Sequence, residues 1–202
     1  AIDFSHKLNI IAVNGRLSEI EVWDCAPGGE INYKEKIRIE GMTSKVTSLK
    51  FMDTKNWIII GTQKGTLFIY SFLENKVIFQ NKSAHLSALT VLVLDPLNRF
   101  IVSGGRDNKI NLWDIDLLTD DYLPIVHQMN QAIQDIAFLS NDWFISVSRG
   151  QNNLGTDRNS VGRMSLWSID LDLFAKKLVQ SKNAWLIEDF EHNDMYQKYI
   201  PN

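Results

Sequence analysis

His85, Ser103 and Asp107 are the residue types of a hydrolytic triad, in which aspartate orients a histidine that deprotonates a serine. A serine nucleophile would also need an exposed hydroxyl group and an oxyanion hole. The chain has no GxSxG segment that would hold such a serine on a sharp turn. The sequence therefore favours a structural role for these three residues, and we expect no catalytic residue and no enzyme activity within the chain.

Other groupings of reactive residue types also lack the spacing that chemistry requires. The segment 103–106, Ser-Gly-Gly-Arg, precedes a predicted strand rather than a helix, so it indicates a hairpin turn and not a phosphate-binding loop. The acidic residues between Asp114 and Asp121 lack the alternation and central glycine of a calcium-binding loop. The histidines and the single cysteine do not have zinc-ligand spacing: His6, His85, His127, His192 and Cys25. We expect neither a metal nor a cofactor.

The composition is that of an ordinary globular protein. Of 202 residues, 45% are hydrophobic, which is enough to build a packed core, and the formal net charge is −3. That charge balance does not favour a nucleic-acid-binding protein, and no apolar run approaches the length of a membrane span. A lone cysteine excludes an intrachain disulfide and favours an intracellular location, cytoplasmic or nuclear.

Two sequence patterns recur with one period and define the elements that position these residues. In the first pattern, a short strand-like segment carries an aromatic residue near its end. These aromatic residues recur at intervals of 43 to 54 residues: Trp23, Tyr70, Trp113 and Trp167. The second is an apolar hexamer that starts at Val46, Leu89 and Ile133. A period of about 40 to 50 residues with several short strands in each unit is typical of a β-propeller blade.

Each unit contains further β-branched runs bounded by turn residues, which completes four strands per unit. Second strands are predicted at 8–13, 56–62, 99–105 and 143–148, and fourth strands at 35–40, 76–81, 123–128 and 176–181. Because one isolated four-stranded sheet cannot bury both faces, the units must stack. We expect repeats over residues 1–182, with blades at approximately 1–41, 42–82, 83–130 and 131–182, and a C-terminal tail, 183–202, that forms a short helix.

Residues 83–114 closely resemble the WD40 repeat. In that family a histidine, a serine or threonine, an aspartate and a tryptophan form a hydrogen-bonded set inside the blade. The matching residues here are His85, Ser103, Asp107 and Trp113. The other repeats depart from the pattern. The second has Met42, Ile60, Lys64 and Tyr70 at these positions, the fourth keeps Ser146 and Trp167 but has Gly150 in place of the aspartate, and the first keeps Trp23.

The resemblance implies an all-β, WD40-type β-propeller, of which about four blades are present. Because propellers of this family usually close with seven blades, four would leave two sheet faces uncovered. We expect the missing blades to come from the rest of a longer chain or from a second chain.

The resemblance also implies a non-catalytic scaffold within a multiprotein assembly. The alternative is that the propeller is an appendage of a larger enzyme or trafficking protein whose activity lies elsewhere. We expect other proteins as partners, with no membrane insertion and no nucleic acid. In this family the turns between second and third strands and the connections between blades share one face that binds partners. Here that face would carry Thr43, Ser44, Gln63, Lys64, Leu86, Ser87, Arg106, Asn130, Gln131, Arg149, Asp157 and Arg158.

Two segments stand apart from the repeat pattern. The loop from Gly150 to Gly162 is far longer than a tight hairpin, and loops of that length are functional or tolerated insertions. The tail carries several aromatic side chains, at Trp185, Phe190, Tyr196 and Tyr199, and would dock on the propeller or on a partner.

Overall fold

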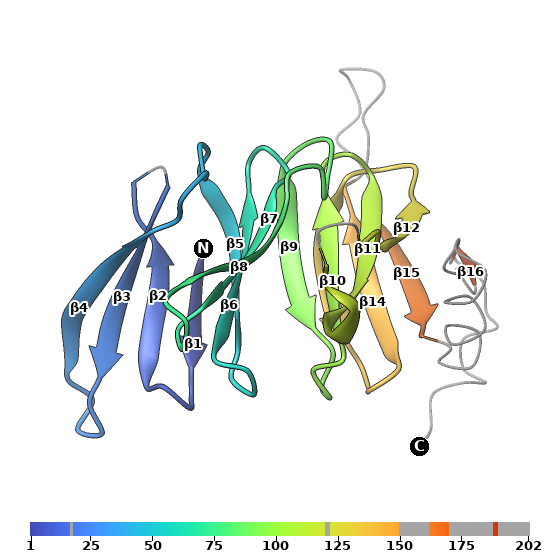
Figure 1. Ribbon diagram of the computed structural model, residues 1–202. Helices are drawn as coiled ribbons and strands as arrows, with labels where there is room; N and C mark the ends of the chain where they lie inside the picture. The colour runs from blue at the N-terminus through green and yellow to red at the C-terminus, as the bar shows by residue number, and fades with distance from the viewer. Residues whose placement is uncertain (17, 120–121, 150–161, 170–187, 190–202) are drawn as a thin grey trace, which may run out of the picture.

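The computed structural model describes residues 1–16, 18–119, 122–149, 162–169 and 188–189, which form four antiparallel sheets placed side by side (Figure 1). The first sheet contains β1 (Ile2–Ser5), β2 (Ile10–Asn14), β3 (Glu19–Cys25) and β4 (Ile31–Arg38). The second contains β5 (Val46–Met52), β6 (Trp57–Thr62), β7 (Leu67–Ser71) and β8 (Lys76–Asn81).

The third sheet contains β9 (Leu89–Leu94), β10 (Phe100–Gly105), β11 (Lys109–Asp114) and β12 (Ile125–Gln128), with the short 3₁₀ helix η1 (Ile115–Leu117) after β11. The fourth contains β13 (Ile133–Phe138), β14 (Trp143–Ser148), β15 (Arg163–Ser168) and β16 (Glu188–Asp189). Within each sheet, every strand pairs with the next one along the chain. This is the meander of a propeller blade, so the all-β blade architecture predicted from the sequence is confirmed.

Asparagine residues make the tight turns of these meanders. Asn9, Asn56 and Asn98 each occupy the turn between the first and second strands of a sheet, and each has a positive φ between 52° and 56°. Asn75 and Asn108 adopt the same left-handed conformation in other turns. Asparagine tolerates this conformation better than most residues do because its short polar side chain can bond locally.

The first strands of successive sheets lie next to one another, β1 beside β5, β5 beside β9 and β9 beside β13. A threonine at the second position of two of these strands bridges to the next sheet. Thr47 Oγ1 donates to the Leu89 carbonyl oxygen, and Thr90 Oγ1 donates to the Ile133 carbonyl oxygen at 2.7 Å. The inner edges of neighbouring sheets are therefore joined by side-chain hydrogen bonds.

Three hydrophobic cores fill the three junctions between sheets. The first joins residues such as Ile20 and Val22 to Ile58 and Ile60, and the second joins Ile59 and Ile69 to neighbours in the third sheet that include Trp113. The third places Val102 and Ile110 against Phe144 and Trp167. The second, third and fourth sheets thus turn the aromatic residue of their third strand toward the sheet before them. Burial of both faces explains why the middle strands are apolar almost throughout.

Side chains between sheets also link the turns at the opposite end of the stack. Asp53, after β5, accepts hydrogen bonds from Ser5 Oγ at 2.5 Å and from the backbone amides of His6 and Lys7. Arg99 holds buried Asp95 through Nε at 2.8 Å and reaches Asp142 of the next sheet through Nη2 at 2.9 Å.

The structure corrects two predicted segments. β4 begins at Ile31 rather than Glu35, because Pro27–Gly29 form a turn in which Gly29, at φ +85°, donates to the Ala26 carbonyl, so that pairing with β3 starts early. The predicted fourth strand at 176–181 lies outside the described residues. Glu188 and Asp189, placed in a predicted helical tail, instead form β16, which pairs with the free edge of β15.

Within the described residues, the four sheets do not close on themselves, so no further sheet covers the outer face of the first or of the fourth (Figure 1). On the first sheet, Ile2 is 67% exposed, and Trp23 packs edge-on against Tyr33 with ring centroids 5.2 Å apart. On the fourth, Trp143 is 40% and Met164 55% exposed. These outer faces carry apolar side chains like those that neighbouring sheets bury at the three junctions.

Candidate functional site

The four residues aligned with the WD40 set come together inside the third sheet. His85 Nδ1 lies 2.9 Å from Asp107 Oδ1, and His85 Nε2 lies 2.8 Å from Ser103 Oγ. Trp113 Nε1 donates to the same Ser103 oxygen at 2.9 Å. His85 comes from the connection before β9, Ser103 from β10, Asp107 from the following turn and Trp113 from β11. One chain of hydrogen bonds thus joins a loop, a turn and two strands.

The protons of these hydrogen bonds can be assigned with a neutral histidine. If Nδ1–H donates to the Asp107 carboxylate, Nε2 is free to accept the hydroxyl proton of Ser103, whose oxygen accepts from Trp113. Asp107 also accepts from the backbone amides of Leu86 and Lys109. Burial raises the pKa of Asp107, but the hydrogen bonds from His85, Leu86 and Lys109 outweigh it and leave the pKa below its ordinary value.

The geometry resembles a catalytic triad, but the serine is closed off from solvent. Ser103 is 0% and His85 2% exposed, and Trp113, which covers the hydroxyl group, is 0% exposed. The serine oxygen already has two hydrogen-bond partners. A substrate carbonyl cannot reach Ser103 Oγ unless the blade opens, so the arrangement suits a structural tie better than nucleophilic attack.

Two other sheets use the corresponding positions differently. In the fourth sheet, Trp167 Nε1 donates to Ser146 Oγ at 2.9 Å, which repeats the indole-to-serine bond without a histidine. In the second sheet, Ile60 replaces the serine, and the Tyr70 hydroxyl donates instead to Asn75 Oδ1 in the turn after β7. The second blade thus exchanges the internal polar set for apolar packing and one peripheral hydrogen bond.

The connections between sheets and the turns after second strands lie together at one end of the stack (Figure 1). Backbone hydrogen bonds join them: Gln63 N donates to the Lys45 carbonyl at 2.8 Å, and His85 N donates to the Gly65 carbonyl at 2.9 Å. On the next sheets, Arg106 N donates to Ala88 and Arg149 N to Ala132. We call the exposed surface of these segments, residues 15, 16, 18, 39–45, 63–66, 82–88, 106–108, 129–132 and 149, the loop face.

The loop face is strongly basic although the chain as a whole is acidic. Among its described residues, the exposed cationic side chains are Arg16, Lys45, Lys64, Lys82, Arg106 and Arg149, and the exposed carboxylate is Glu40. Leu86, 77% exposed, provides an apolar side chain on this surface. A surface of this charge attracts acidic partners and repels basic ones.

The residues predicted to bind partners occupy the loop face where they are described. Thr43, Gln63, Lys64, Leu86, Ser87, Arg106, Asn130 and Arg149 are exposed, whereas Ser44 and Gln131 are half-buried. Gln131 is engaged internally, because its Oε1 accepts from Ser148 Oγ at 2.9 Å. Asp157 and Arg158 lie outside the described residues, as does most of the loop between Gly150 and Gly162.

Three of the six cationic residues of the loop face were not predicted from the sequence. Arg16, Lys45 and Lys82 lie in the same connections as predicted residues, and their positions next to strand ends could have shown this.

The described part of the chain contains no group of three or more His, Cys, Asp or Glu side chains that could hold a metal ion. It also contains no helix with the length and apolar character needed to cross a bilayer.

Comparison with known proteins agrees with this architecture. Residues 77–114 match the family described as WD domain, G-beta repeat. The chain is 34% identical over 70 residues to mouse WD repeat-containing protein 3 and 33% identical over 79 residues to human striatin-3, which is 35% and 37% of this chain. The crystal structure of the computationally designed Ika8 protein superimposes on 94% of this chain with a TM-score of 0.65 at 22% identity.

A stack of four-stranded meanders with a buried Trp–Ser–His–Asp set defines a β-propeller segment. This chain therefore contains a match to the WD40 repeat at residues 77–114, among sheets of the same blade form. It spans 7% of mouse WD repeat-containing protein 3, 10% of human striatin-3 and 48% of the designed structure.

Proposed function

We propose that this chain is a non-catalytic scaffold that binds other proteins through its loop face. The observation that carries the proposal is the six exposed cations gathered there with one exposed carboxylate, on a chain of formal charge −3. The stack of sheets holds most of these side chains in short connections that backbone hydrogen bonds join, so little conformational entropy is lost there when a partner binds. The partner surface would be acidic, with an apolar contact for Leu86.

The test replaces Lys64, Arg106 and Arg149 together by glutamate in the native protein. These side chains are exposed, so the variant should fold normally and lose its co-purifying partners. The matched control changes three lysines away from the loop face, the exposed Lys7 and Lys34 and the half-buried Lys55, to glutamate, with the same change in net charge. Retention of every partner by the loop-face variant would show that the assignment of this surface is wrong.

The uncovered faces of the first and fourth sheets support a second part of the proposal. Their exposed apolar side chains, such as Ile2 and Met164, are expected to pack against further blades and complete a ring of about seven. Whether those blades belong to the same polypeptide is decided by the intact mass of the native protein and of the chains that co-purify with it. A much longer chain with an additional catalytic or trafficking domain would instead favour the appendage alternative.

A further inference from the structure

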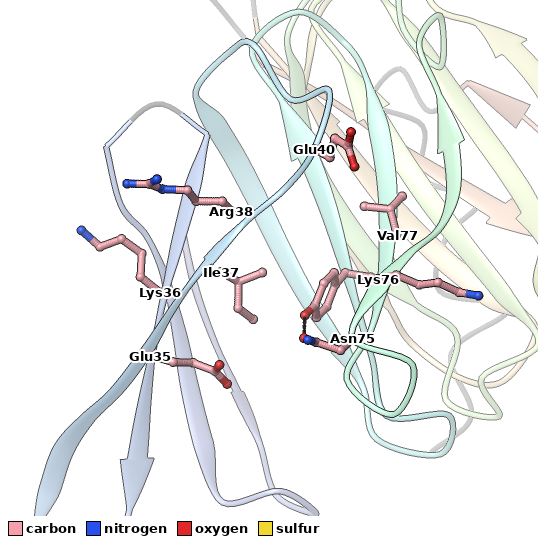
Figure 2. A pocket seen from close by; sticks show the side chains of 9 residues that line it. Glu35, Lys36, Ile37, Arg38, Glu40, Asn75, Lys76 and Val77 are labelled. Atoms are coloured by element: carbon pink, nitrogen blue, oxygen red, sulfur yellow. Dashed lines mark hydrogen bonds between the residues drawn. The ribbon is translucent and has the colours of Figure 1, made fainter.

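A cleft of about 440 Å³ opens between the first and second sheets on the outer side of the stack. Figure 2 shows β4 on one side and the turn between β7 and β8 on the other. Ile37 and Val77 line it with aliphatic surface, and Tyr70 and Asn75, joined by their hydrogen bond, line it as well. None of the six loop-face cations lines the cleft, although Glu40 belongs to both surfaces.

One residue of β4 distinguishes this junction between sheets from the other two. In each of the three sheets that are followed by another sheet, one residue of the fourth strand pairs with the residue that precedes the aromatic position of the third strand. That residue is Glu35 in the first sheet, Phe79 in the second and Ile125 in the third. Phe79 packs edge-on against Trp113 with ring centroids 6.2 Å apart, and Ile125 packs against the third core. Glu35 places a carboxylate where the other junctions are filled by apolar side chains.

The cations that line the cleft are all engaged outside it. Lys36 Nζ and Arg38 Nε bind Glu19 at 3.2 and 3.1 Å, and Lys76 Nζ binds Glu74 at 2.8 Å. In Figure 2 the Lys36, Arg38 and Lys76 side chains point away from the opening. They therefore do not neutralise the carboxylates that face it.

Those carboxylates belong to Glu35 and Glu40. Figure 2 shows Glu35 directed toward the cleft from β4 and Glu40 above Val77. Within the part of the chain that the structure describes, neither forms an ion pair. The charge of Glu35 also acts on Tyr70, which lines the cleft. Burial, and to a smaller extent the Glu35 carboxylate, raise the pKa of Tyr70 above its ordinary value.

We infer that this cleft binds a basic side chain, arginine or lysine, carried by a peptide segment of a partner protein. The aliphatic stem of that side chain packs on Ile37 and Val77. Its cationic head is held by Glu35, with the Asn75 amide as a further hydrogen-bonding group, and Glu40 adds negative charge to the same cleft. A divalent cation fits less well, because it requires six or more oxygen ligands in a small shell and the described residues offer no cluster of three acidic or imidazole groups.

The test uses the 202-residue chain and two synthetic peptides, acetyl-Ala-Arg-Ala-amide and its uncharged citrulline counterpart. NMR titration with the arginine peptide should give saturable shifts of the Ile37 and Val77 methyl signals, weakened when NaCl rises from about 50 to 200 mM. The citrulline peptide should leave these signals in place. The double variant Glu35→Gln/Glu40→Gln should weaken binding of the arginine peptide at least tenfold.

Glu30→Gln, an exposed glutamate in the turn before β4, is the matched control and should bind like the wild type. Equal shifts from both peptides, or binding that the double variant retains, would overturn the inference. Calcium producing the same shifts at lower concentration would also overturn it, in favour of a metal. The loop-face variant with Lys64, Arg106 and Arg149 changed to glutamate should bind the peptide normally, so failure of the proposed scaffold surface and failure of this site are distinguishable.

Discussion

Trp167 Nε1 donates to Ser146 Oγ across 2.9 Å, the same length as the bond from Trp113 to Ser103 in the preceding sheet. In the third sheet this bond continues to His85 and Asp107, whereas Met129, 7% exposed, stands at the histidine position of the fourth sheet. The indole-to-serine bond is thus the part of the buried set that the two sheets share. In the third sheet, His85 and Asp107 extend this bond to the connection that precedes β9.

Replacement of Trp113 by alanine should destabilise the chain by about 3 to 5 kcal/mol, because it empties a fully buried indole site and leaves Ser103 short of a donor. Chemical denaturation followed by circular dichroism measures the change in the free energy of unfolding. Trp143→Ala, at a 40% exposed tryptophan, is the control and should cost far less. A loss under about 1 kcal/mol at Trp113 would contradict its role as a core residue.

Asp107 should make stability depend on pH in the acid range. Its pKa is lowered in the folded chain from an ordinary value of 3.8, so its ionised form stabilises the fold above about pH 4. That contribution is lost as pH falls through the folded-state pKa. Asp107→Asn should therefore be less stable at pH 7 and show a shallower loss of stability between pH 5 and pH 2, measured by thermal unfolding.

Asp114→Asn is a control for this experiment, because the pKa of Asp114 is shifted in the opposite direction. Burial raises the pKa of Asp114, so its ionised form is disfavoured in the folded chain, and the substitution should not flatten the acid limb. If both variants change the slope in the same direction, the effect would not come from the hydrogen bonds that Asp107 accepts.

Thr90→Val should weaken the junction between the third and fourth sheets. Valine has nearly the same shape but lacks the hydroxyl group that donates to the carbonyls of Gly104 and Ile133 at 3.0 and 2.7 Å. We expect a loss of about 1 kcal/mol, with faster amide exchange in β13. Thr43→Val, at an exposed threonine of the loop face, should change neither quantity. Equal effects of the two substitutions would show that the hydrogen bond from Thr90 to the Ile133 carbonyl does not cause the loss of stability.

Gly65→Ala should destabilise the second sheet by roughly 2 kcal/mol or more, since Gly65 has φ +78° and an added Cβ would lie 2.0 Å from the His85 carbonyl oxygen. Backbone cannot move aside as a flexible side chain can. Gly28→Ala is the matched change, because an added Cβ there meets no atom within 4 Å. Thermal midpoints of the two variants give the comparison, and similar midpoints would contradict the expectation.

The blade architecture could be predicted from the sequence because its signals are local and repeated. Trp23, Tyr70, Trp113 and Trp167 recur with the strand pattern, and each lies on the third strand of its sheet. The cleft could not be predicted in this way. Glu35 was assigned to a strand, but a one-residue bulge opposite Val22 and Trp23 decides which face of β4 it occupies. Such a shift in register moves a side chain from one face of a sheet to the other.

The basic loop face was only partly predictable for a related reason. Lys64 and Arg106 follow second strands directly, so their position at one end of the stack follows from the meander. Lys45 and Lys82 lie in connections between sheets, and their exposure depends on how neighbouring sheets pack. The β16 strand depends on pairing between segments separated by a long stretch of chain, which no local pattern encodes.

The threonine bonds between first strands have a geometric consequence for the curvature of the stack. Thr47 and Thr90 fix the separation of the second, third and fourth sheets at their inner edges, which makes each of these two junctions a pivot. The angle between two sheets is then set by the thickness of the side chains at the outer strands, such as Phe79 against Trp113. The radius of an assembled ring, and hence the number of wedges in one full turn, is therefore encoded in the side-chain volumes at its rim.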